Sequence, residues 1–133
     1  MLPIVLKRLD ELKRDGPVPP QDDPRDTPVE PFLDETYSAS VSLFQRLADK
    51  AKNAGKEIEA PSGIGLYSDG GLTAVWNNWS LYLSIDQDEI HINVMRRNAP
   101  GAVFQLVSDV TRHELNEQGF EAAAHRLFGI LSA

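Results

Sequence analysis

Three histidines, His91, His113 and His125, are the side chains in this sequence best suited to acid–base or metal chemistry. A zinc site needs several converging ligands, and no HxH or HxxxH spacing joins any two of them. His113 would share a helical face with Glu114 and Glu117, but that face carries no second histidine. We therefore predict no metal site, no cofactor and no catalytic residue in this chain.

Three further stretches approach known site motifs but each lacks a necessary part. Residues 86–89, Asp-Gln-Asp-Glu, are too few for a calcium loop and include no glycine at the bend, so they predict a polar hairpin turn. Residues 63–65, Gly-Ile-Gly, lack the third glycine of a dinucleotide site. Residues 68–71, Ser-Asp-Gly-Gly, lack the Gly-x-Ser-x-Gly order of a nucleophile elbow.

The sheet that would position these side chains is predicted by the residues from 63 to 95. Apolar and polar residues alternate there, and the alternation breaks only at clusters of turn-forming residues. This pattern is typical of an antiparallel meander. We expect its four strands at about Gly63–Tyr67, Leu72–Trp76, Ser80–Ile85 and Glu89–Met95.

Alternation assigns each side chain of the meander to one of two faces. The core face is apolar and must be covered by helices: Leu72, Ala74, Trp76, Leu81, Leu83, Ile85, Ile90, Ile92 and Val94. The outer face is mixed, and Tyr and Met are enriched where proteins meet. The candidate binding residues on this face and at its turn are Val75, Trp79, Tyr82, His91, Asn93 and Met95.

The first predicted helix covers residues 2–14, and its apolar stripe is Leu2, Val5, Leu6, Leu9 and Leu12. Residues 16–33 follow as a Pro-rich linker. The stripe must be buried against this chain, against a second copy with which the helix is exchanged, or against a partner. The stiff linker slightly favours exchange, with the outer sheet face receiving the helix.

Two more helices follow from apolar residues at helical spacing. One spans about residues 35–54, with Asp34 or Thr36 as its cap and Gly55 just past its end. The other spans about residues 118–131. We expect its apolar stripe of Phe120, Leu127, Phe128 and Leu131 to pack on Leu81, Leu83, Ile90 and Ile92.

The segment 102–110 fits both a helix and a strand. Its valines and Leu106 recur at a helical period, whereas Val-Phe-Gln-Leu-Val has strand propensity. We favour a fifth strand. Thr111 and Glu114 have the spacing of a capping box, which predicts a short helical turn after that strand.

The residues 69–76, followed by 81–85 and 90–92, resemble a loose group of small bacterial proteins. The shared pattern is a helix, a Gly-Gly turn, a strand that ends in Trp and two further alternating strands. The likeness covers roughly residues 61–94 and excludes the N-terminal helix and linker. The group has no assigned activity, so the resemblance implies an α+β fold and no functional residue.

The whole chain, with 133 residues, has room for one domain with a real core. We predict a two-layer α+β domain over residues 34–133, in which an antiparallel meander of four or five strands has helices on one face. The helix within residues 1–15 and the linker of residues 16–33 precede this domain.

Charge and hydropathy limit the kinds of partner and the cellular compartment that we expect for this chain. A formal net charge of -7 disfavours nucleic acid, because a phosphate backbone is repelled by an acidic protein. No apolar run reaches the length of a membrane span, and the N-terminus lacks the apolar core of a signal peptide. Together with the absence of cysteine, these features predict a cytoplasmic protein.

These observations favour a non-enzymatic protein-interaction module of an accessory, antitoxin-like or immunity-like kind. It would bind a protein partner through the outer sheet face, the N-terminal helix or both. One alternative is a homodimeric assembly protein with an exchanged N-terminal helix. A less favoured alternative is an enzyme with a site near His91.

Overall fold

The computed structural model describes residues 1–15, 32–66, 71–76, 80–97 and 106–132. Within these residues the chain forms three helices and one five-stranded sheet. In chain order the elements are α1 (Leu2–Asp15), α2 (Asp34–Asn53), β1 (Gly63–Leu66), β2 (Leu72–Trp76), β3 (Leu81–Ile85), β4 (Glu89–Arg97), β5 (Leu106–Glu114) and α3 (Glu117–Leu131). None of these helices is long and apolar enough to cross a membrane.

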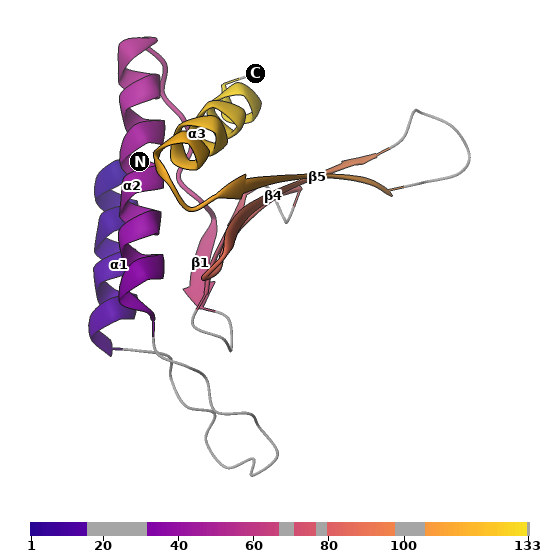
Figure 1. The fold of residues 1–133 in the computed structure, drawn as a ribbon. Coiled ribbons are helices and arrows are strands. Elements are labelled where there is room, and N and C mark those ends of the chain that lie inside the picture. Colours follow the sequence, from indigo (N-terminus) through magenta and orange to yellow (C-terminus); the bar gives the residue numbers. More distant parts are fainter. Residues whose placement is uncertain (16–31, 67–70, 77–79, 98–105, 133) are drawn as a thin grey trace.

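The sheet is an antiparallel meander in which each strand pairs with the next along the chain. The helices form a second layer on one of its faces (Figure 1). The register places Leu83 opposite Ile92 and Ile85 opposite Ile90, and all the predicted core-face residues are buried. The predicted α+β fold is therefore confirmed.

Helix α2 occupies the centre of the helical layer. Leu43, Phe44 and Leu47 on this helix are fully buried, and the Phe44 ring lies 6.3 Å from that of Trp76. The predicted end is confirmed, because Gly55 adopts a φ of 66° and Lys56 N–H donates to Ala51 O over 2.9 Å. This is the hydrogen-bond pattern of a Schellman motif, which glycine favours at positive φ.

The predicted side-chain cap of α2 is wrong. Asp34 is the first helical residue, Leu33 precedes it in an extended conformation, and no side chain accepts a capping hydrogen bond. Thr36 is buried instead. Apolar packing holds the start of the helix instead. Phe32 is buried, and its ring meets that of Tyr37 edge to face, with the ring centroids 5.7 Å apart.

Helix α1 packs within its own chain, beside α2 and against β1. Val5 and Leu9 are fully buried in the same core as the sheet residues. Tyr37 Oη donates to Asp10 Oδ1 over 2.5 Å, which joins α1 to α2. In this single chain the outer sheet face does not receive the helix, and residues 16–31 of the predicted linker lie outside the described residues.

The preference for a fifth strand is confirmed, but β5 begins at Leu106, and residues 102–105 lie outside the described part of the chain. The predicted helical turn from Thr111 to Glu114 is wrong. Both residues are in β5, where β4 supplies a pairing partner for each. Helix α3 starts later, and its cap is Asn116, whose Oδ1 accepts from Gly119 N–H over 2.8 Å.

Helix α3 lies over β4 and β5, while α2 lies over β2 and β3. Leu127 on α3 is buried, whereas the other predicted stripe residues are only partly buried: Phe120, Phe128 and Leu131. The expected packing on Ile90 and Ile92 fits this placement. The expected packing on Leu83 is wrong, because α2 and not α3 covers β3. Leu81 of that strand lines a hollow together with Ile130 and Leu131 of α3.

Gly119 in the first turn of α3 generates a stability prediction. A Cβ at this position would lie 1.7 Å from Glu114 O, so Gly119→Ala must push α3 away from β5. We expect a loss of about 1–3 kcal/mol in the free energy of unfolding, the usual cost of overpacking. Urea denaturation followed by circular dichroism measures it.

Gly129→Ala is the matched control on the same helix. A Cβ at Gly129 would meet nothing within 4 Å. Alanine should therefore raise the free energy of unfolding by about 0.5–1 kcal/mol through helix propensity alone. Equal effects of the two substitutions would contradict the close approach of α3 to β5.

Candidate interaction surface

The sheet face opposite the helices brings together side chains that the sequence singled out. The register places Val75 opposite Tyr82, Tyr82 opposite Asn93, and Asn93 opposite Val110. Side chains at such positions have Cβ atoms about 4.5–5.5 Å apart, so these four form one row across β2 to β5. The first three are half-buried, and Val110 is 46% exposed. We call this row the outer-face row.

A second, polar row runs beside it. Thr73 pairs with Ser84, Ser84 with His91, and His91 with Arg112. His91 Nε2 lies 3.2 Å from Glu89 Oε2 on the same strand, and both side chains are partly exposed. The pair therefore places hydrogen-bonding groups on this face.

The remaining candidates divide between the described and undescribed parts of the chain. Met95 is on the same face, one pair beyond the outer-face row and opposite Ser108. Trp79 lies outside the described residues. Sequence reasoning missed Val110 because the fifth strand was assigned no outer face, and it missed Arg112 because that strand was expected to end at residue 110. Extending the fifth strand to pair with all of residues 89–95 would have placed both residues on the outer face.

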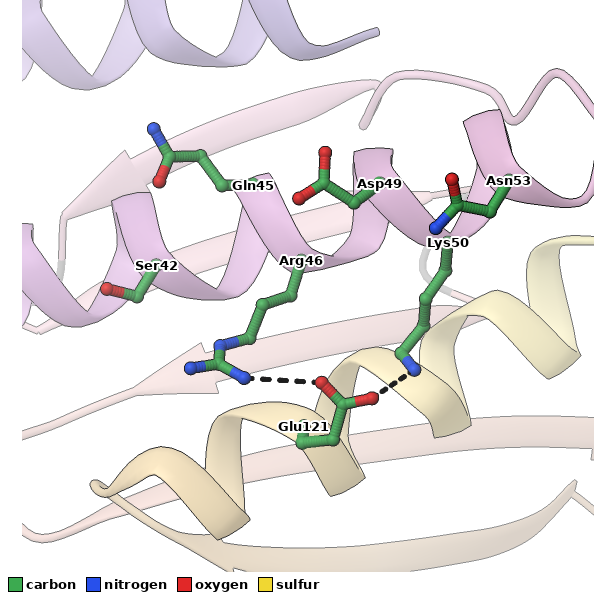
Figure 2. Close-up of a pocket in the computed structure, with 7 residues that line it drawn as sticks. All are labelled: Ser42, Gln45, Arg46, Asp49, Lys50, Asn53 and Glu121. Carbon is green, nitrogen blue, oxygen red and sulfur yellow. Dashed lines mark hydrogen bonds and ion pairs between the residues drawn. The ribbon is translucent and has the colours of Figure 1, made fainter.

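The helical layer contains a polar hollow of about 450 Å³ between α2 and α3. Figure 2 shows Arg46 and Lys50 reaching from α2 toward Glu121 on α3. Arg46 also pairs with Glu117. The hydrogen bond from Lys50 is the main cause of a lowered pKa at Glu121, and the hydrogen bond to Glu117 is the main cause of a raised pKa at Arg46.

These charges neutralise one another across the contact between α2 and α3. Largely exposed ion pairs of this kind contribute little to stability, and networks contribute more than isolated pairs. The charges of Arg46, Lys50 and Glu121 in the hollow are therefore explained by their mutual contacts between the two helices. Among the described residues, no three His, Asp or Glu side chains are grouped so that they could hold a metal ion.

Comparison with known proteins adds no assignment. The chain matches no family model, no curated protein and no solved structure. The function is therefore argued from the residues and geometry of this chain.

A third polar group lies on the covered side of the sheet, between β5 and α3. Arg126 Nη2 on α3 is 3.0 Å from Asp109 Oδ2, and His113 Nε2 is 3.2 Å from Thr111 Oγ1. Burial is the main cause of a lowered pKa at His113, and the positive charge of Arg126 lowers it further. The neutral form of this histidine is the one that the fold favours.

The lowered pKa of His113 predicts a pH dependence of stability. The unfolded chain, with an ordinary histidine pKa of about 6.5, binds the proton more readily than the folded chain does. Stability is therefore lost as pH falls through about 6.5 toward the lower pKa of the folded state. Lowering the pH from about 7.5 to about 5.5 should therefore lower the urea midpoint of unfolding more for the wild type than for His113→Gln.

The matched control for this measurement is His125→Gln, because His125 is an exposed histidine on α3. It should retain the wild-type pH profile. A His113→Gln profile that follows the wild type throughout would show that this histidine is not held in its neutral form.

Proposed function

We propose that this chain is a non-enzymatic protein-interaction module whose contact surface is the outer face of the sheet. The observation that carries the proposal is the outer-face row, which crosses four strands on the side opposite the helices. The row combines an aromatic, two aliphatic and one amide side chain: Tyr82, Val75, Val110 and Asn93.

The chemistry of this face suits a protein rather than a small molecule. Residues on adjacent strands of a sheet form a broad surface, and aromatic residues and Met are enriched in the buried centres of interfaces. Tyr82 and Met95 supply such groups, and His91 and Ser84 supply hydrogen-bonding groups around them. The net charge of -7 favours approach by a basic partner at long range.

Covering the outer-face row also supplies a driving force. Val110 leaves 46% of its surface in water. Removing apolar surface from water contributes roughly 25 cal/mol per Å². A partner that covers the row and the neighbouring Met95 would therefore gain binding free energy by burying Val110 and the exposed parts of Tyr82 and Met95.

The first test uses photo-cross-linking in cells of the native source. A photoreactive amino acid in place of Tyr82 should give a defined adduct with a partner protein. The same amino acid in place of Gln45, on the exposed side of α2, should give none. Equal adducts from both positions would argue against the outer face.

A further position tests the N-terminal helix as a contact. Ile4 on α1 is 63% exposed and, with Val110, is one of the two large exposed apolar residues in the described part of the chain. An adduct from Ile4 alone would place the contact on α1 and contradict the proposed surface.

The second test measures affinity for the partner identified in this way. Truncating an aromatic residue at the centre of an interface often costs about 2 kcal/mol or more, so Tyr82→Ala should weaken binding by about tenfold or more. Gln45→Ala should bind as the wild type does, and circular dichroism checks that both variants are folded. Unchanged affinity of Tyr82→Ala would exclude Tyr82 as part of the contact.

A further inference from the structure

The two edge strands of the sheet, β1 and β5, differ in the contacts that they make on their outer sides. At the β1 edge, α1 contacts the strand, and Arg8 Nε donates to Ile64 O over 3.2 Å. At the opposite edge, β5 pairs with β4 on one side only, and no other described residue forms a backbone hydrogen bond with it. An unpaired edge of this kind is a template for another strand.

We propose that the free edge of β5 pairs with β5 of a second copy of this chain, antiparallel and about a twofold axis at Thr111. The two sheets would then form one continuous sheet, with the outer-face rows of both copies on the same side. This is strand addition between identical edges, which gives the closed, self-complementary contact of a dimer. It differs from exchange of α1, which packs in its own chain.

The backbone geometry identifies the groups that are available. Met95 N–H donates to Ser80 O over 2.8 Å, so the backbone of odd-numbered β4 residues points toward β3. Because the direction alternates along a strand, the even-numbered residues of β4 point toward β5. Their partners on β5 are His113, Thr111 and Asp109.

It follows that the neighbouring residues of β5 direct their backbone groups away from β4. Val110 and Arg112 leave their N–H and C=O groups along the free edge, whereas the backbone of Glu114 packs against Gly119 of α3. Backbone donors and acceptors need partners when they leave water. A second β5 strand supplies matching groups at the same spacing.

The side chains of β5 fit a second copy of the strand in the register set by an axis at Thr111. A twofold axis at Thr111 places Val110 opposite Arg112 of the partner subunit, and Asp109 opposite His113 of the partner subunit. No like charges face each other in this register, and the aliphatic stem of arginine can cover the exposed Val110. An axis at Arg112 would instead set two arginines directly opposite, which is unfavourable.

The sequence of β5 lacks two common means of blocking an edge. Residues 106–114 contain neither Pro nor Lys, which native proteins often place on unpaired edges. Asp109, the charged residue of β5 on the covered side of the sheet, is already paired with Arg126 of the same chain. Figure 1 also shows that β5 runs out from beneath α3, away from the helical layer.

Proline substitutions test the pairing in the full-length chain. Val110→Pro and Arg112→Pro each remove one donor from the free edge and leave the donors that face β4 in place. The wild type should sediment as a dimer, and both variants should remain folded with a dimer dissociation constant raised at least tenfold. Val110→Thr, which retains the N–H group, should dimerise as the wild type does.

Two further substitutions separate this contact from others. Thr111→Pro removes a donor that faces β4, so it should lower the stability of the monomer fold itself. Tyr82→Ala lies on β3, two strands from the edge, and should leave dimerisation unchanged. A monomeric wild type at every concentration, or proline variants that dimerise as the wild type does, would overturn the proposal.

Single cysteine substitutions test the register between the two β5 strands, even if a proline variant fails to fold. The chain has no cysteine, so each single substitution introduces the only thiol. At the twofold axis two copies of one residue meet with Cα atoms about 4.5 Å apart, within the range for a disulfide. Thr111→Cys should therefore form interchain disulfides faster than Val110→Cys, and Ala122→Cys on the exposed side of α3 should not. Fastest cross-linking at residue 122, or none at residue 111, would overturn the proposed pairing.

Discussion

The packing of α2 on the inner face of the sheet is the contact on which the other elements depend. Leu43, Phe44 and Leu47 have no exposed surface, and Phe44 lies against Trp76. Helix α2 has α1 on one side, α3 on the other, and β2 and β3 beneath it. Truncating one of its buried side chains would leave a cavity that rigid neighbours fill only in part. The positions of α1 and α3 both follow from this helix.

One-sided coverage of the sheet follows from that arrangement. Because all three helices meet around α2, their apolar stripes are buried on the same side as Leu83 and Ile92. The opposite face retains partly exposed side chains, among them Tyr82 and Met95. The same asymmetry extends to the sheet edges, since α1 reaches β1 through Arg8 while β5 has no comparable neighbour in the described part of the chain.

Strand β5 departs from the alternation that governs the rest of the sheet. Its covered side carries Asp109, Thr111 and His113, while Val110 is on the outer side. These polar groups are accommodated because Arg126 extends from α3 to pair with Asp109 at the margin of the core. The strand is held chiefly by its long ladder with β4, and less by apolar burial.

The sequence by itself determined the elements whose pattern is local. The faces of β2, β3 and β4 follow from a period of two with one apolar face, and Gly55 ends α2 because glycine favours the positive φ that a Schellman motif requires. Five of the six candidate binding residues lie where that alternation places them, on the face opposite the helices; the sixth, Trp79, is outside the described residues.

Tertiary structure decided what depends on residues far apart in the chain. Leu106–Glu114 has no single apolar face, so only pairing with β4 sets the bounds of β5 and brings Val110 and Arg112 onto the outer face. Docking of α1 in its own chain and the uncapped start of α2 likewise depend on which distant apolar side chains they meet. Periodicity states that a face must be buried, but the partner that buries it is fixed only when the layers assemble.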